Sequence, residues 1–333
     1  MVLTIATRDE PRPTIAPPLV TAWALTTGEA GMRTQVRGLA QAVAGTVIEK
    51  VAPERSLAAA LAGLTAAPSL ARTFSRPWPD ILITCGRRSA PYAVALKRAS
   101  GGRILAVHVQ DPRAFRDEFD LIIAMDHDRI PEGPRVIKVA TALHDITPTA
   151  LADAAERWKF QFARLGTPLA GVTIGGDLRG RPFTLEDGRR LLNGLQRLRQ
   201  SGAGLAITPS RRTPTVVRAL LAEAFAGDPR VFLWDLEGEN PYRAILALSD
   251  RLVVTTDSVS MVSEAIATGH PVELLDLGFR RHVHFVQRLV QEGLARRFEG
   301  NPEPFHTRGP IDSTQVAATA VRRLLQARTG MVG

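Results

Sequence analysis

One stretch near the end of the chain, residues 251–272, constrains the fold more than any other. It opens with the apolar run 252–255, which predicts a buried strand of a parallel sheet. Asp257 and Ser258 follow at once and are residue types that cap helix N-termini. A glycine and a proline near residue 270 end the helix. A strand that leads directly into a helix places backbone N–H groups at the carboxyl edge of a sheet, where anions bind.

The predicted helix also has a polar face, which carries Ser260, Ser263 and Glu264. Glu264 lies more than one turn inside the helix, too deep to cap it. We therefore expect its carboxylate to accept hydrogen bonds from the hydroxyls of a ligand whose phosphates lie at the helix start. An ordinary strand–helix unit with a solvated glutamate is the alternative.

The length and the composition of the chain favour two domains without a membrane-spanning helix. The 333 residues are too many for one small core. The single cysteine, Cys85, excludes an internal disulfide framework and fits a reducing compartment. The sequence contains no run of 18 apolar residues, so no membrane-spanning helix is predicted. The first twenty residues are charged and rich in proline, so we expect an arm rather than a signal peptide, and a cytoplasmic protein.

The net charge of +9 indicates an anionic partner. Nucleic acid is disfavoured, because only 5% of the residues are aromatic and no basic tail or nucleic-acid motif is present. Many arginines instead follow predicted strands in short loops. This placement favours binding of a phosphorylated small molecule.

Strands and helices alternate along the chain, which is typical of doubly wound parallel sheets. In the first half we predict strands at 19–25, 47–51, 80–85, 103–109, 119–125 and 136–139, with helices at 33–44 and 57–64. After a helix at 149–164 the pattern restarts, with strands at 171–174, 205–208, 231–234, 252–255 and 272–275, then helices around 283–294 and 312–328. We therefore predict two Rossmann-like domains, 1–148 and 149–310, and a final helical segment, 311–333.

Two glycine-rich turns do not match known cofactor fingerprints. The turn at 28–35 lacks the G-x-G-x-x-G pattern and its acidic partner, which disfavours a dehydrogenase. The turn at 175–180 lacks the Lys-Ser/Thr pair of a P-loop, which disfavours ATP hydrolysis. Each is equally consistent with a plain turn. No G-x-S-x-G elbow is present to support a hydrolase.

Two arginine pairs follow predicted strands and are more informative. Arg211 and Arg212 lie in the sequence SRRTP, where Thr213 is expected to cap a helix, so both guanidinium groups would lie at the mouth of a sheet. Arginine forks match phosphate oxygens. Arg87 and Arg88 repeat the arrangement in the first half. A solvated basic loop is the alternative for each pair.

The triplet Asp126-His127-Asp128 is similar to a D-x-D motif that holds a divalent ion in another class of transferase. That class has a single sheet domain, and hard cations need more oxygen ligands than this triplet provides. We therefore predict no metal site.

Seven motifs occur here in the order and spacing of one family. They are GEAG with Gln35 (28–35), GRRSAP (86–91), DPR (111–113), HD (127–128), SRRTP (210–214), ENPY (239–242) and TDSVSM followed by SEA (256–265). Over residues 20–300 the chain thus resembles the mitochondrial fission "elongated mitochondria" family, described as glycosyltransferases. It also resembles the nucleotide-sugar transferase of peptidoglycan lipid synthesis.

The resemblance implies a GT-B fold, in which two Rossmann-like domains face a cleft and the C-terminal helix returns to the first domain. It implies that the second domain holds a nucleotide-diphosphate sugar, with Glu264 on the ribose, and that no cofactor is used. The acceptor is unknown; a lipid-linked or membrane-associated one would place the protein at the inner membrane surface. In plants the family is named for recruiting a dynamin-like fission protein.

Two functions follow from these expectations: a metal-independent glycosyltransferase, or a non-catalytic adaptor that keeps the fold. For the enzyme, the candidate bases are Glu29, Asp111 and Asp128. The residues expected to bind the donor are Gly175, Gly176, Ser210, Arg211, Arg212, Thr213, Asn240, Asp257, Ser258, Ser260, Met261 and Glu264. Those expected on the acceptor or phosphate side are Gly28, Gly31, Gln35, Gly86, Arg87 and Arg88.

Overall fold

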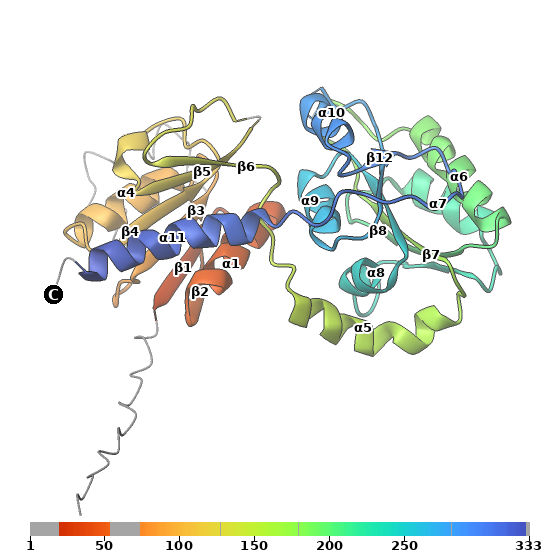
Figure 1. Ribbon diagram of the computed structural model, residues 1–333, viewed down its shortest axis with the longest axis horizontal. Coiled ribbons are helices and arrows are strands. Elements are labelled where there is room, and N and C mark those ends of the chain that lie inside the picture. Colours follow the sequence, from red (N-terminus) through yellow and green to blue (C-terminus); the bar gives the residue numbers. More distant parts are fainter. Residues whose placement is uncertain (1–19, 54–73, 127, 179, 281, 331–333) are drawn as a thin grey trace, which may run out of the picture.

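The computed structural model describes residues 20–53, 74–126, 128–178, 180–280 and 282–330, which form two parallel six-stranded sheets with helices packed on them (Figure 1). The fold class predicted from the sequence is confirmed. The N-terminal arm and the helix predicted at 57–64 lie outside the described residues.

The first sheet consists of β1 (Thr21–Thr26), β2 (Thr46–Val51), β3 (Ile81–Cys85), β4 (Leu105–Val109), β5 (Leu121–Met125) and β6 (Val136–Val139), in the order β2–β1–β3–β4–β5–β6. Side chains alternate between its faces. Ala22 and Ala24 pack with α1 (Ala30–Val43) and α11 (Ser313–Gly330), while Trp23 and Leu25 pack with α4 (Ala90–Ala99). A short helix, η1 (Arg116–Glu118), precedes β5.

The second sheet consists of β7 (Leu169–Ile174), β8 (Gly204–Pro209), β9 (Val231–Leu233), β10 (Arg251–Thr255), β11 (Val272–Leu275) and β12 (Arg296–Arg297), in the order β12–β11–β10–β7–β8–β9. Its helices are α5 (Pro148–Ala163), α6 (Leu185–Gln200), α7 (Thr215–Ala224), α8 (Tyr242–Leu248), α9 (Val259–Ala267) and α10 (Val283–Gln291).

Both strand orders contain a point at which the chain reverses direction across the sheet. In the first sheet this point lies between β1 and β3, and in the second it lies between β7 and β10. Ligands of open α/β sheets bind in the crevice beyond the carboxyl ends of such strands. The turns after these four strands, at 27–29, 86–88, 175–180 and 256–258, are therefore the places to look for a site.

Local capping explains two differences from the predicted helices. The sequence prediction contained no α6, although Thr184 and Asp187 form a capping box and four buried leucines follow on one face. The expected capping role of Thr213 is wrong. Helix α7 begins at Thr215 with Pro214 as N-cap, and the Thr213 hydroxyl donates instead to the carbonyl oxygen of Gly175.

The C-terminal helix returns to the first domain, as expected, and begins at the domain junction (Figure 1). The Ser313 hydroxyl accepts a hydrogen bond of 3.0 Å from the Thr141 amide, and the Thr314 hydroxyl accepts one of 2.9 Å from the His144 amide. From the second domain, Ser263 accepts a 2.9 Å bond from the Ala142 amide. The 141–145 segment is thus tied to both α11 and α9.

A buried ion cluster lies at the amino end of the second sheet, opposite the crevice. The Glu273 carboxylate is 3.4 Å from Arg251 Nη1 and accepts a 2.9 Å hydrogen bond from Arg296 Nε. Arg251 also donates to the carbonyl oxygens of Asn301 and Pro302, each at 2.8 Å. The cluster therefore fixes the segment around residues 301–302, which precedes α11 in the chain. None of the described helices is long and apolar enough to cross a membrane.

Candidate functional site

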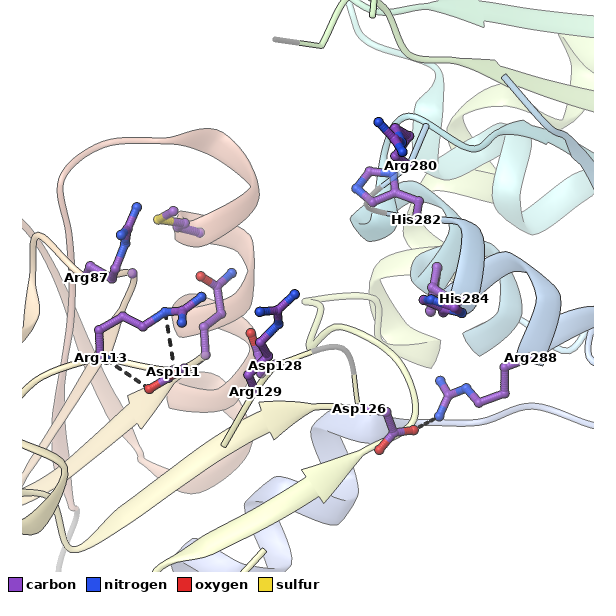
Figure 2. Close-up of a pocket in the computed structure, with 14 residues that line it drawn as sticks. Arg87, Asp111, Arg113, Asp126, Asp128, Arg129, Arg280, His282, His284 and Arg288 are labelled. Atoms are coloured by element: carbon purple, nitrogen blue, oxygen red, sulfur yellow. Dashed lines mark hydrogen bonds and ion pairs between the residues drawn. The ribbon is translucent and has the colours of Figure 1, made fainter. Parts of the chain in front are cut away.

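A cavity of about 1120 Å³ lies between the two domains (Figure 2). Its lining contains five arginines against three aspartates, so its field favours an anion. The lining residues are Met32, Gly86, Arg87, Gln110, Asp111, Arg113, Asp126, Asp128, Arg129, Arg280, His282, His284, Phe285 and Arg288.

The first-domain wall of the cavity includes a strained loop after β4. Gln110, Arg113 and Phe115 have positive φ angles of 76°, 66° and 61°, which cost energy in residues other than glycine. Asp111 holds this loop: it accepts hydrogen bonds of 3.0 and 2.8 Å from Arg116 and one of 2.9 Å from the Arg113 amide. Burial raises the pKa of Asp111, but these bonds outweigh burial and lower it below its ordinary value. Asp111 is therefore ionised and already engaged.

The second-domain wall carries Arg280 and His282 (Figure 2). Nδ1 of His282 lies 2.8 Å from the carbonyl oxygen of Thr256. A carbonyl can only accept, so Nδ1 carries the hydrogen and Nε2 holds the lone pair when the ring is neutral. The ring also contacts Phe279, with centroids 5.9 Å apart. Its orientation and tautomer are thus fixed by the turn after β10.

One ion pair joins the two walls. Arg288 of α10 contacts the Asp126 carboxylate after β5 (Figure 2) and also donates to the carbonyl oxygen of Ala140. This engages the first aspartate of the D-x-D triplet. Among the described residues, which exclude His127, no group of three or more His, Cys, Asp or Glu is placed to hold a metal ion.

Of the three carboxylates predicted as bases, Asp111 and Asp128 line the cavity. Glu29 is exposed at the start of α1 and accepts a 2.7 Å hydrogen bond from the Thr27 hydroxyl. Burial, together with the charges of Asp128 and Glu29, raises the pKa of the Cys85 thiol, so this thiol is not a nucleophile. Asp128 and Glu29 therefore both lie near the end of β3.

The predicted donor residues after β7, β8 and β10 form one braced cluster. Asp257 Oδ2 accepts a 2.7 Å hydrogen bond from the Gly176 amide and lies 3.3 Å from Arg212 Nη2. A methyl group on Gly175 would lie 1.9 Å from Asp257, and one on Gly176 would lie 2.0 Å from the Arg212 carbonyl oxygen. Both glycines are thus required by close packing between neighbouring loops.

The arginine loop of this cluster is held by Ser210, whose amide donates to Thr213 Oγ1 at 2.9 Å and whose hydroxyl accepts from the Arg212 amide at 3.2 Å. Arg211 is exposed, and its side chain has no hydrogen bond or ion pair to any described residue. Ser258 caps α9 as predicted, accepting a 3.3 Å bond from the Met261 amide. Asn240 accepts a 2.9 Å bond from the Tyr242 amide at the start of α8.

A third group of the predicted residues lies at the domain junction. A methyl group on Gly31 of α1 would lie 3.2 Å from Ser260 Oγ of α9, so the two helix starts meet. Gln35 is buried one turn later, and its side-chain amide donates to the Gly31 carbonyl at 3.2 Å. Gly28 has a φ of 107°, which favours glycine. Gly86 and Arg87 line the cavity, with Arg88 exposed in the same turn.

Glu264 lies in an environment that the sequence did not predict. Its carboxylate is buried and accepts a hydrogen bond from the Tyr242 hydroxyl. Burial, aided by the nearby charge of Asp145, raises the pKa of Glu264 to about 7 against the opposing effects of Tyr242 and Arg243. The Tyr242 hydroxyl already occupies Oε2 of this buried carboxylate, which differs from the expected open polar face.

The Glu264 pKa leads to a prediction about pH. Because the folded-state pKa of about 7 lies above the ordinary glutamate pKa of 4.5, the contribution of this group to stability is complete below pH 4.5 and is lost as the pH rises through 7. We expect Glu264→Gln to remove this loss, so that its stability relative to the wild type rises by roughly 1–3 kcal/mol between pH 5 and pH 8. Urea unfolding at each pH measures this difference.

The matched control is Glu223→Gln, since Glu223 is exposed. It should leave the pH profile of the wild type unchanged. A Glu264→Gln profile parallel to that of the wild type would mean that the carboxylate is not buried in solution.

Sequence reasoning missed most of the second-domain wall and part of the first. Arg129 follows β5 and Arg280 follows β11, so both obey the rule that drew attention to Arg87 after β3. Asp126 was interpreted as part of a metal motif and Asp128 also as a candidate base, but Arg129, Arg280 and the histidines at 282 and 284 were not among the predicted site residues. The signal that could have identified both arginines is a charged residue just beyond the carboxyl end of a predicted strand.

This architecture, two parallel six-stranded domains that enclose a cavity, is that of the GT-B class of nucleotide-sugar enzymes. The UDP-GlcNAc 2-epimerase of Methanocaldococcus jannaschii matches with a TM-score of 0.60 at 11% identity, over 92% of this chain and 99% of that one. MurG of Acinetobacter baumannii matches with a TM-score of 0.52 at 13% identity, over 91% and 99%. At these identities the likeness shows the fold alone.

Sequence comparison defines the family more narrowly. The chain belongs to the mitochondrial fission ELM1 family, whose model matches residues 30–325. The mitochondrial fission protein ELM1 of Arabidopsis thaliana is 30% identical over 287 residues, covering 78% of this chain and 67% of that protein. An uncharacterized protein of Rickettsia prowazekii is 28% identical over 261 residues, covering 66% and 72%.

Proposed function

We propose that the chain is a glycosyltransferase that transfers the sugar of a nucleoside-diphosphate sugar and needs no metal ion. The observation that carries this proposal is the reversal of strand order between β7 and β10, which puts the braced Gly176–Asp257 contact at the crevice of the second sheet. The M. jannaschii epimerase has been crystallised with UDP-GlcNAc and UDP, which makes uridine nucleotides the first ligands to test.

In the proposed reaction, an acceptor hydroxyl attacks the anomeric carbon of the donor sugar. The bond from that carbon to the β-phosphate oxygen breaks, and the nucleoside diphosphate leaves with the electron pair. Arg211, Arg212 and the backbone N–H groups at the start of α9 would offset the charge that develops on it. Asp128, which lines the cavity and is less engaged than Asp111, would accept the proton from the hydroxyl.

The arginine pair supplies the decisive test. Charged hydrogen bonds contribute roughly 1.5–3 kcal/mol each, so Arg211→Ala with Arg212→Ala should weaken UDP binding at least about a hundredfold. EDTA should leave binding by the wild type unchanged. Isothermal titration calorimetry with UDP and UDP-sugars measures both effects.

Because Arg212 also braces Asp257, the single variant Arg211→Ala serves as a second probe that leaves the cluster intact. Arg189→Ala with Arg323→Ala, two exposed arginines elsewhere, removes the same charge and should bind UDP normally. Chelator-sensitive binding that survives loss of Arg211 and Arg212 would favour a metal instead. Failure of the wild type to bind any nucleotide or nucleotide sugar would favour the adaptor function.

A further inference from the structure

Three arginines of the cavity lack a counter-charge. The side chains of Arg87, Arg129 and Arg280 make no hydrogen bond or ion pair with any residue that the structure describes. The other two arginines of the lining differ: Arg113 Nε lies 3.5 Å from Asp111, and Arg288 contacts Asp126. The three cations therefore have their charge available for a ligand.

Two of the three aspartates of the same cavity are paired with other arginines, so the aspartates offset at most one of these three positive charges. Asp111 is held by Arg116 and the Arg113 amide, and Asp126 is held by Arg288. Asp128 accepts a 3.0 Å hydrogen bond from the Met125 amide. Because like charges that share a cavity repel one another, an arrangement that keeps them together is most stable with an anion between them.

The cations come from both walls. Arg87 follows β3 and Arg129 follows β5 in the first domain, whereas Arg280 follows β11 in the second, on the opposite side of the cavity (Figure 2). None of the predicted donor residues after β7, β8 and β10 lines this cavity. The strain in the loop at Gln110 and Arg113 is also concentrated here, which is common where backbone is held for binding. The lining of the cavity is thus distinct from the predicted donor residues, and it adjoins them through the contact of His282 with Thr256.

We propose that this cavity binds a phosphate or diphosphate group of the acceptor, so that the sugar is transferred to a molecule that is itself phosphorylated. The inference rests on the proposed function, because it takes the nucleotide to occupy the other site. The cavity, at about 1120 Å³, is larger than the roughly 300–1,000 Å³ of ordinary ligand sites. It has room for a diphosphate and for part of the group that the diphosphate carries.

Inorganic pyrophosphate, titrated into the full chain with and without saturating UDP, tests this proposal. Wild-type protein should bind pyrophosphate equally well in both titrations. Arg87→Gln with Arg129→Gln and Arg280→Gln should weaken pyrophosphate binding about a hundredfold and leave UDP binding within about threefold. Arg211→Ala should show the reverse pattern. The variant Arg189→Gln with Arg308→Gln and Arg323→Gln removes three exposed charges elsewhere and should bind both ligands normally.

The outcomes separate the two proposals. Pyrophosphate that fails to bind, that UDP displaces, or that the triple cavity variant binds normally overturns the acceptor site while UDP binding still stands. Pyrophosphate that binds at the cavity in a protein without affinity for any nucleotide keeps the anion site but overturns its role as an acceptor site, together with the proposed function.

Discussion

Replacing Glu273 with alanine is expected to lower the free energy of unfolding by about 3–5 kcal/mol. The Glu273 side chain is fully buried and offsets the charges of two arginines, of which Arg251 is itself buried. Its removal leaves Arg251 with carbonyl oxygens as acceptors but without a negative partner. The loss of this partner in a dry environment costs more than the Coulomb energy of an exposed pair. Urea unfolding at pH 7 measures the effect.

Glu273→Gln is the matched control, because it keeps a hydrogen-bond acceptor of the same shape and should cost less than alanine. Since the cluster lies at the amino end of the second sheet, the residual folded Glu273→Ala protein should bind UDP as the wild type does. An alanine variant within about 1 kcal/mol of the wild type would show that the pair contributes no more than an exposed ion pair.

Gly38→Ala should also destabilise the protein, although helix propensity alone predicts the opposite. Alanine in place of glycine inside a helix is worth up to about 1 kcal/mol. At Gly38 of α1, however, a methyl group would lie 2.0 Å from the carbonyl oxygen of His144 in the segment that joins the domains. That oxygen also accepts a 3.0 Å hydrogen bond from Thr314, so it cannot move alone. We expect a net loss of roughly 1–3 kcal/mol in thermal or urea unfolding.

Gly330→Ala in α11 provides the comparison, because nothing lies within 4 Å of a methyl group there. It should be neutral or slightly stabilising. If Gly38→Ala proved as stable as Gly330→Ala, the close contact between α1 and the joining segment would not exist in solution.

Strand β10 and helix α9 could be predicted because local pattern determines them. The apolar run at 252–255 lies in β10, and Ser258 caps α9, since both depend on residues adjacent in the chain. The environment of Glu264 could not be predicted in the same way. Tyr242, its partner, is 22 residues away on another helix, and periodicity alone cannot distinguish a polar face that meets solvent from one that meets a tyrosine.

The candidate site was predictable in part for a related reason. The rule that ligands gather beyond the carboxyl ends of strands was sufficient for Arg87 and Asp111, which line the cavity. It did not indicate which of many arginines would pair with carboxylates. Arg288 and Asp126 are 162 residues apart, and only the packing of the two domains brings them together.

The position of α11 has a consequence for how the chain folds as it is synthesised. Ala317, Ala318 and Val321 of α11 are fully buried in the same apolar cluster as Leu39 of α1, yet they follow the whole second domain in the chain and leave the ribosome after it. Domains form in the order of synthesis, so the first sheet will stand with that apolar face uncovered until the second domain is complete. A chaperone that recognises apolar surface should bind nascent chains ending near residue 310 and release them once α11 has emerged.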